Sequence, residues 1–326
     1  GNSAFQGCNG LTNITIPDGV TSIGNSAFQG CNGLTNITIP DGVTSIGDYT
    51  FYGCNSLTSI NIPAGVSSIN NEAFGYCSNL SSVHITDLNA WCNISFASES
   101  ANPLCYAHHL YLNDEEIKDL VIPDGVTTIG AYTFRYCSGF TSLRLPESIT
   151  IIPESVFQGC SGLTTIMMPS QLSIIRASAF SGCSSLTAVS IPASVEYIYQ
   201  NAFSGCTALK QINAQPTTPP FLYDNSFSDY SVQLNVQSGT AEAYRTAQGW
   251  QNFTTINDGN VYYQLTVKTD AHSTVEYGDE SATGQTTTFN VQEGGNAVLS
   301  IGAENGYTIA SVTVDGVDRT GDVSEG

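Results

Sequence analysis

Basic residues are scarce in this 326-residue chain, which holds 8 lysines and arginines against 28 aspartates and glutamates and carries a formal net charge of -20. No basic residue precedes Lys118. Such a surface repels phosphate backbones and anionic lipid, so the composition argues against nucleic-acid and membrane-surface binding. Long apolar runs are missing too, because no segment approaches the roughly 20 residues that a membrane-spanning helix needs.

Familiar catalytic and cofactor motifs are also missing. The sequence has no phosphate or dinucleotide fingerprint, no H-E-x-x-H and no C-x-x-C. It begins inside a repeat, as an excised fragment would, and shows no basic segment followed by an apolar stretch, so no signal peptide is visible. We therefore expect no enzyme, no cofactor and no bound metal. Few carboxylates accompany the aspartates of the Pro-Asp-Gly turns, so a calcium ladder is not expected.

Phenylalanine followed three residues later by cysteine recurs every 23 residues, in two groups of four. Residues 2–24 are identical to residues 25–47. A period of about 20–50 residues is typical of a solenoid, whose coils bury their apolar side only against their neighbours. The pairs are Phe5/Cys8, Phe28/Cys31, Phe51/Cys54, Phe74/Cys77, Phe134/Cys137, Phe157/Cys160, Phe180/Cys183 and Phe203/Cys206.

Within one repeat, residues 57–62 predict a strand with alternating inward side chains, which Pro63 ends because it cannot donate to a ladder. Val66 and Ile69 predict a second short run along the opposite wall. The segment 73–77 is expected to close the coil as a turn of helix or 3₁₀ helix, with its phenylalanine inside the coil. Each repeat then carries two strands and one aromatic plug.

Ten cysteines would ordinarily suggest a disulfide framework. Equivalent side chains on adjacent coils lie about 4.8 Å apart, however, whereas the Cβ atoms of a disulfide approach to about 3.8 Å. The eight in-phase cysteines are therefore predicted to form a ladder of buried thiols. Cys92 and Cys105 are out of phase, and the sequence leaves open whether they pair.

The pattern L-x-x-I-x-I-P-x-x-V-x-x-I-x-x-x-A-F-x-x-C resembles the BspA-type, or Treponema pallidum type, leucine-rich repeat over residues 1 to about 257. The resemblance implies a secreted or surface-anchored bacterial protein, with adhesion to host matrix or to other cells as its role. We expect a β-rich leucine-rich repeat solenoid at 1–257, with an irregular, protruding insert at about 87–116 and a cap at about 215–257. The insert is expected to end in a hairpin over 110–122.

Residues 258–326 are expected to form a small all-β module that lacks a final strand. The module resembles the InlB B-repeat type found in bacterial surface proteins. Its expected strands lie at 264–267, 288–291, 297–301 and 310–314.

The candidate binding surface is the solvent face of the L-x-x-I-x-I sheet, which is concave in leucine-rich repeats; the alternative is a polar face that only keeps the sheet soluble. Small polar residues fill most of its central column, and Arg144 and Met167 on adjacent coils are the first departures. His108 and His109 would point to opposite faces of a strand, so they are not expected to bind a metal together. The candidate ligand-binding residues are Asn61, His84, Arg144, Met167, Ser190 and Asn213 on the sheet, and Trp91 and His108 in the insert.

The leading hypothesis is an extracellular or cell-surface interaction scaffold, an adhesin that binds an extracellular protein or glycan from a host or another microbe. One alternative is a structural stalk that binds nothing specific. Another is a glycan-active enzyme with its site under the insert, which would need a carboxylate pair about 5–10 Å apart. The sequence indicates neither a ligand identity nor an oligomeric state.

Overall fold

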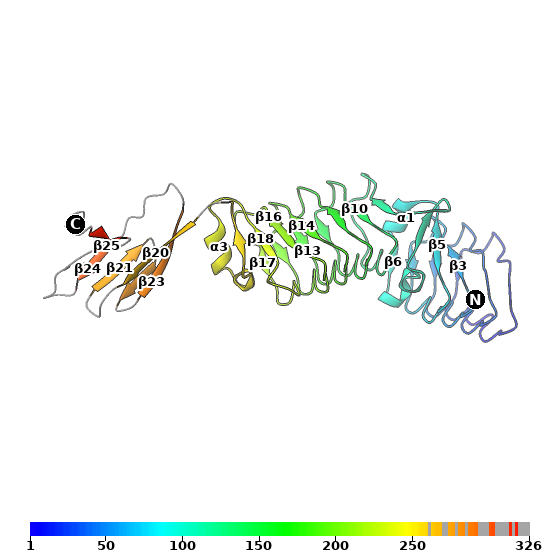
Figure 1. The fold of residues 1–326 in the computed structure, drawn as a ribbon. Coiled ribbons are helices and arrows are strands. Elements are labelled where there is room, and N and C mark those ends of the chain that lie inside the picture. The colour runs from blue at the N-terminus through cyan, green and yellow to red at the C-terminus, as the bar shows by residue number, and fades with distance from the viewer. Residues whose placement is uncertain are drawn as a thin grey trace. The chain divides into compact units, whose positions relative to one another are not determined.

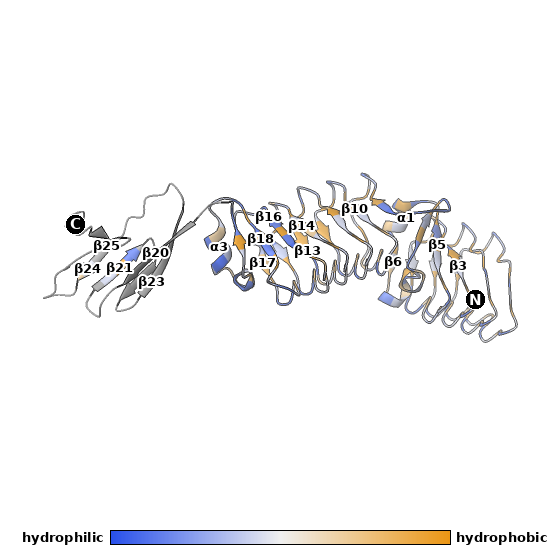
Figure 2. Cartoon of the chain, viewed as in Figure 1, coloured by the Kyte–Doolittle hydropathy of each residue, from blue (hydrophilic) through white to orange (hydrophobic). Residues whose placement is uncertain are grey.

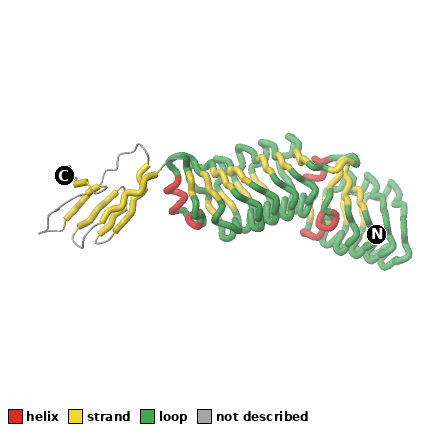
Figure 3. The backbone as a smooth tube through the Cα atoms, in the orientation of Figure 1, coloured by secondary structure: helices red, strands yellow, loops and turns green. Residues whose placement is uncertain are grey.

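The computed structural model describes residues 1–259 and, beyond them, the strands β20 to β26 (Figure 1). The chain divides into two compact units, Gly1–Asp258 and Gly259–Gly326. The first unit is a β-solenoid of about ten turns with a step of about 23 residues, which confirms the predicted fold class. Turns and loops make up most of each coil, and short strands line the walls (Figure 3).

The L-x-x-I-x-I strands form the first wall of the solenoid. They stack in three separate sheets, and every pairing is parallel except the hairpin between β7 and β8. The strands are β3 (Ser59–Asn61), β5 (Ser82–Ile85), β7 (Leu110–Leu112) and β8 (Glu115–Glu116); β9 (Asp119–Val121), β10 (Ser142–Arg144) and β12 (Thr165–Met167); and β14 (Ala188–Ile191), β16 (Gln211–Ala214), β18 (Gln233–Asn235) and β19 (Ile256–Asn257).

The V-x-x-I runs form the second wall, as two parallel four-stranded sheets. One holds β1 (Ser22–Ile23), β2 (Ser45–Ile46), β4 (Ser68–Ile69) and β6 (Ser95–Phe96), and the other holds β11 (Ile151–Ile152), β13 (Ile174–Ile175), β15 (Tyr197–Ile198) and β17 (Phe221–Leu222). In each strand the second residue is buried in the core between the walls. Hydrophobic residues accordingly recur along the strands in Figure 2.

The Phe-x-x-Cys segment is a chain of tight turns, so the predicted turn of helix is wrong. Ser26 and Gly30 lie in the left-handed region, with φ of 56° and 72°. Successive backbone N–H groups donate alternately to the next coil and to their own coil. The Phe28 N–H donates to the Thr50 carbonyl of the next coil at 2.9 Å, whereas the Gln29 N–H donates to the Ser26 carbonyl of the same turn. In a helix all of these N–H groups would donate to carbonyls of the same coil. In the observed turns every second N–H instead forms a hydrogen bond with the next coil.

Stacked phenylalanines fill the core. The first column, Phe5 to Phe74, has centroid distances of 5.2 to 5.5 Å between neighbours, and the second begins at Phe134. The second column ends at Phe227, whose ring lies 5.1 Å from that of Phe203. The repeat pattern did not reveal Phe227, because it follows Phe203 by 24 residues instead of 23.

All ten cysteines are free thiols, and the in-phase ones are buried except Cys8 in the first coil. Six of their Sγ atoms donate to the carbonyl oxygen of the phenylalanine 26 residues earlier, as Cys160 does to Phe134 at 3.2 Å. Burial raises the pKa of Cys77, Cys137 and Cys206 to about 12. The predicted ladder of buried thiols is confirmed for seven of the eight in-phase cysteines, and Cys8 is the exception.

The ladder predicts slow thiol chemistry in the native protein. A thiol reagent at neutral pH should label Cys8, which is exposed, and leave the buried thiols unmodified, because the thiolate is the nucleophile and burial suppresses it. Unfolding in denaturant without a reducing agent should then expose all ten, as counted by mass spectrometry. Fewer than ten labelled thiols after unfolding would show that disulfides are present.

The insert is packed into the stack and is not the protruding loop that was expected. It contains helices α1 (Leu88–Cys92) and α2 (Leu104–Ala107), the 3₁₀ turn η1 (Glu99–Ala101) and β6, which joins the second wall. Trp91 is 1% exposed, and its indole N–H donates to the Thr133 carbonyl at 3.2 Å. The Cys105 thiol donates to the Glu99 carbonyl, and Cys92 and Cys105 are not paired.

The predicted hairpin is present but shorter than expected. Asn113 and Asp114, with φ of 52° and 66°, turn β7 into the antiparallel β8, which ends at Glu116. The following strand β9 belongs to the next sheet and pairs with β10. The hairpin therefore separates the first two sheets of the first wall.

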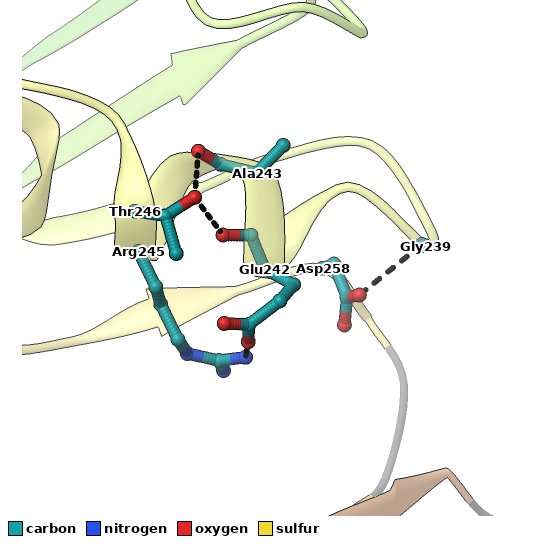
Figure 4. Close-up of polar contacts among 6 residues, drawn as sticks. All are labelled: Gly239, Glu242, Ala243, Arg245, Thr246 and Asp258. Carbon is teal, nitrogen blue, oxygen red and sulfur yellow. Dashed lines mark hydrogen bonds and ion pairs between the residues drawn. The ribbon is translucent and has the colours of Figure 1, made fainter. Parts of the chain in front are cut away.

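The predicted cap contains further coils, because β17, β18 and β19 extend both walls to Asn257. The covering elements are α3 (Ala241–Thr246) and the 3₁₀ turn η2 (Trp250–Asn252). The Tyr244 hydroxyl donates to the Pro216 carbonyl at 2.8 Å and the Trp250 indole donates to the Pro220 carbonyl at 2.7 Å. In Figure 4, Arg245 pairs with Glu242 within α3, and the Gly239 N–H donates to Asp258 at 3.1 Å.

In the second unit, β20 (Tyr262–Lys268) pairs antiparallel with β23 (Thr286–Gln292), which confirms two of the expected strands. β21 (Ser273–Tyr277) lies between β22 (Glu280–Thr283) and β24 (Ser300–Ala303), and β25 (Thr313–Val314) pairs with β26 (Val317–Asp318). The expected strands at 297–301 and 310–314 fall partly outside the described residues. The expectation that the module lacks a final strand also concerns residues that the structure does not describe.

Candidate functional site

The central column of the first wall is aligned as the 23-residue step predicts, but in three segments. Asn61, His84 and Tyr111 share one register across β3, β5 and β7. Val121, Arg144 and Met167 share a second across β9, β10 and β12, and Ser190, Asn213 and Asn235 share a third across β14, β16 and β18. The candidate residues of the sheet are thus divided among three hydrogen-bonded sheets, and β12 of the second still lies next to β14 of the third.

The first segment is internally bonded around His84. Its Nδ1 lies 2.9 Å from Asp114 Oδ1 and its Nε2 lies 3.1 Å from Ser82 Oγ. The imidazole also stacks on Tyr111 at 4.8 Å. Because both ring nitrogens have partners within the chain, His84 fixes the hairpin turn against β5 and has little free bonding capacity. The sequence did not indicate Tyr111, because the longer coil shifts its spacing from His84 to 27 residues.

A second polar cluster lies beside the hairpin. His109 Nδ1 and Lys118 Nζ approach the two carboxylate oxygens of Glu116, at 2.6 and 2.7 Å. The hydrogen bond from Lys118, followed by that from His109, lowers the pKa of the Glu116 carboxyl. His108 is not part of this cluster: it ends α2 with φ of 61°, and its Nδ1 faces the Tyr136 carbonyl at 3.0 Å. The expectation that His108 and His109 alternate on a strand is therefore wrong.

The insert residue Trp91 is buried, so it does not reach a ligand at the surface. The insert has a different role, which the sequence did not reveal. Arg135 Nη2 binds Glu99 Oε2 at 2.6 Å, its Nε donates to Gln158 at 2.8 Å, and its guanidinium lies 4.5 Å from the centroid of the Tyr136 ring. These contacts tie the insert to the coil that follows it.

The second segment is the most open to a ligand. Met167 is 62% exposed and Val121 is 48% exposed, and Arg144 lies between them in register. A depression of about 410 Å³ adjoins the row. Its lining residues are Asp124, Arg144, Leu145, Pro146, Glu147, Ser148, Met167 and Met168. Among residues 1–259, no carboxylate lies within ion-pairing distance of Arg144. The row combines an unpaired cation with two apolar side chains.

The third segment is an amide ladder. The Asn235 side chain donates to Asn213 Oδ1 at 2.9 Å, Gln211 donates to the same oxygen at 2.7 Å, and Asn213 donates to Ser190 at 3.5 Å. These groups satisfy one another, so they offer a ligand less than the second segment does. In the described part of the chain, no group of three or more His, Cys, Asp or Glu side chains is placed to hold a metal ion, and no helix is long and apolar enough to cross a membrane.

A family model described as the BspA type leucine rich repeat region matches residues 1–102 and 107–233 in six copies. The match does not extend to the second unit, for which the InlB-like resemblance stays a prediction. No curated protein matches the sequence. A leucine-rich repeat protein of T. pallidum is similar in structure at 25% identity and a TM-score of 0.40, covering 54% of this chain and 78% of that one.

Two further solved structures are similar. A leucine-rich repeat protein from Bacteroides ovatus has 24% identity and a TM-score of 0.38, over 79% of this chain and 86% of that one. A leucine rich cell surface protein from Faecalibacterium prausnitzii has 22% identity and a TM-score of 0.35, over 75% and 82% of the two chains.

Proposed function

The chain belongs to the BspA-type leucine-rich repeat family, and from that premise we propose that it is a bacterial surface or secreted adhesin that binds an extracellular protein or glycan through the row Val121, Arg144 and Met167. Repeat scaffolds of this kind present extended surfaces for interaction. The proposed action is binding, without catalysis.

The observation that carries the proposal is the guanidinium of Arg144, which has no ion-pair partner in the described part of the chain and lies beside the exposed Met167. The chain has 28 acidic residues, yet none lies within ion-pairing distance of this cation among residues 1–259. An arginine flanked by apolar side chains suits a ligand that presents a carboxylate or amide next to an apolar group. The depression next to the row gives space to the apolar or amide part of such a ligand, because Asp124 and Glu147 in its lining would repel a carboxylate.

The test is a binding screen of the full chain against immobilised matrix proteins, glycans and cell surfaces. We expect saturable binding at micromolar concentration or tighter, and a loss of about tenfold in affinity for the double variant Arg144→Ser with Met167→Ser. Lys210→Ser removes the same charge from an exposed position outside the row and should leave affinity unchanged. Absence of saturable binding would contradict the proposal that the chain is an adhesin. Equal affinity of the double variant and the Lys210→Ser control would show that the binding site lies outside the Arg144 row.

A further inference from the structure

The second wall carries an exposed apolar column in its C-terminal sheet. Strands β11, β13, β15 and β17 pair in parallel so that Ile151, Ile174, Tyr197 and Phe221 share one register. Ile151 is 37% exposed, Tyr197 40% and Phe221 49%. Their neighbours along the strands, Ile152, Ile175, Ile198 and Leu222, are buried in the core. The outward side chains are not part of the hydrophobic core, although Ile174 is half-buried.

The N-terminal sheet of the same wall provides an internal comparison. In β1, β2, β4 and β6, the corresponding outward residues are Ser22, Ser45, Ser68 and Ser95, in one register. The inward residues stay apolar in both sheets. The coil thus folds with serine at this position, and stacking does not explain the isoleucines and aromatic residues of the C-terminal sheet. A row of apolar groups that the fold does not need points to an interaction surface.

Four rings make this surface continuous, and we call Tyr197, Tyr199, Phe221 and Tyr223 the aromatic platform. Tyr199 and Tyr223 stack at 4.5 Å, and Phe221 lies 4.7 Å from Tyr223. Tyr197 lies 6.4 Å from Phe221 and 6.5 Å from Tyr199. Aromatic residues held in place by one another lose little freedom on binding and dominate the binding energy of many protein interfaces.

The charged residues that flank this sheet are mostly acidic. Glu196 and Asp224 are exposed beside the platform strands β15 and β17, Glu154 is exposed after β11, and the basic residue beside these described strands is Arg176, after β13. The faces of the rings attract cations, and Arg135 over Tyr136 shows this contact within the same chain. The net charge of -20 draws cationic partners and repels anionic ones. We propose that the aromatic platform docks a basic, apolar segment of a protein partner, on the wall opposite the Arg144 row.

The proposal is tested with the full chain and a labelled ten-residue peptide of alternating lysine and leucine, followed by fluorescence polarisation. Tyr197→Ser with Phe221→Ser, which installs the residue of the N-terminal sheet, should weaken binding about tenfold. Tyr49→Ser with Tyr76→Ser removes two comparably exposed tyrosines of a second ring cluster, which they form with Tyr52, and should leave binding unchanged if the peptide selects the platform over other exposed rings. A second variant, Glu154→Gln with Glu196→Gln and Asp224→Asn, retains the rings and should weaken binding and reduce its salt dependence.

Three results would overturn the proposal. Equal binding by the platform variant and the tyrosine control would show that the peptide responds to the overall charge or to exposed rings in general, and not to the platform. Equal or tighter binding of a matched glutamate and leucine peptide would exclude a basic partner. Binding of neutral oligosaccharides that depends on the platform, without binding of the lysine peptide, would assign the surface to glycans instead.

Discussion

Replacing Phe157 with alanine should lower the free energy of unfolding by about 3–5 kcal/mol. The ring is 1% exposed and lies between Phe134 at 5.6 Å and Phe180 at 5.4 Å. The substitution removes the apolar burial and both ring contacts, and it leaves a cavity between two coils whose backbones are fixed by the ladder. Equilibrium unfolding in urea, followed by circular dichroism, measures the loss.

The first coil offers the matched control. Phe5 is 37% exposed and stacks on one neighbour only, Phe28, so Phe5→Ala should cost less than about 2 kcal/mol. Similar losses for the two variants would mean that stacking on both sides adds nothing. A loss below about 1 kcal/mol at Phe157 would place its ring outside the core.

Raising the pH above about 9 should destabilise the solenoid steeply. Burial raises the folded-state pKa of Cys77, Cys137 and Cys206 to about 12, whereas an unfolded thiol has a pKa near about 8.5. The unfolded chain therefore loses these protons first. The stability that the neutral thiols contribute is complete below about pH 8.5 and is lost as the pH rises toward the folded-state pKa, by up to about 1.4 kcal/mol per pH unit for each thiol.

The measurement is the free energy of unfolding, in reducing buffer, between about pH 9 and about pH 10.5. Cys137→Ala removes one of the thiols and should reduce the slope against pH by about 1.4 kcal/mol per unit. Leu163→Ala, at another buried position, should lower stability at every pH and keep the original slope. An unchanged slope in Cys137→Ala would show that this thiol does not couple folding to protons.

The repeat period was sufficient to predict much of this molecule. A fixed step of 23 residues places equivalent side chains on adjacent coils, so the inward Ile60, the stacked Phe157 and the neighbouring Arg144 and Met167 follow from counting residues. The same counting identified the buried thiols, because strand spacing is too wide for a disulfide. These properties follow from the residues of one repeat and from the constant 23-residue step to the next coil, and both can be read from the sequence.

Counting fails where a coil changes length. The insert lengthens one coil, and the position of Trp91 inside the stack depends on how that extra chain packs against Thr133. The hairpin of β7 and β8 then divides the first wall, which separates His84 from Arg144. Each outcome depends on contacts between residues that are distant in sequence, so local patterns do not encode it.

The sequence by itself therefore determined the solenoid, its two walls, its aromatic and thiol core, and the row at Arg144. Only the tertiary structure decided which surfaces are continuous. The Phe-x-x-Cys turns became a ladder because left-handed residues such as Ser26 turn alternate N–H groups toward the next coil. The aromatic platform arose because Phe221, displaced by an extra residue from the 23-residue step, still pairs in register with Tyr197. The parallel hydrogen bonds between β15 and β17 align these residues, although the 24-residue spacing between them departs from the 23-residue step.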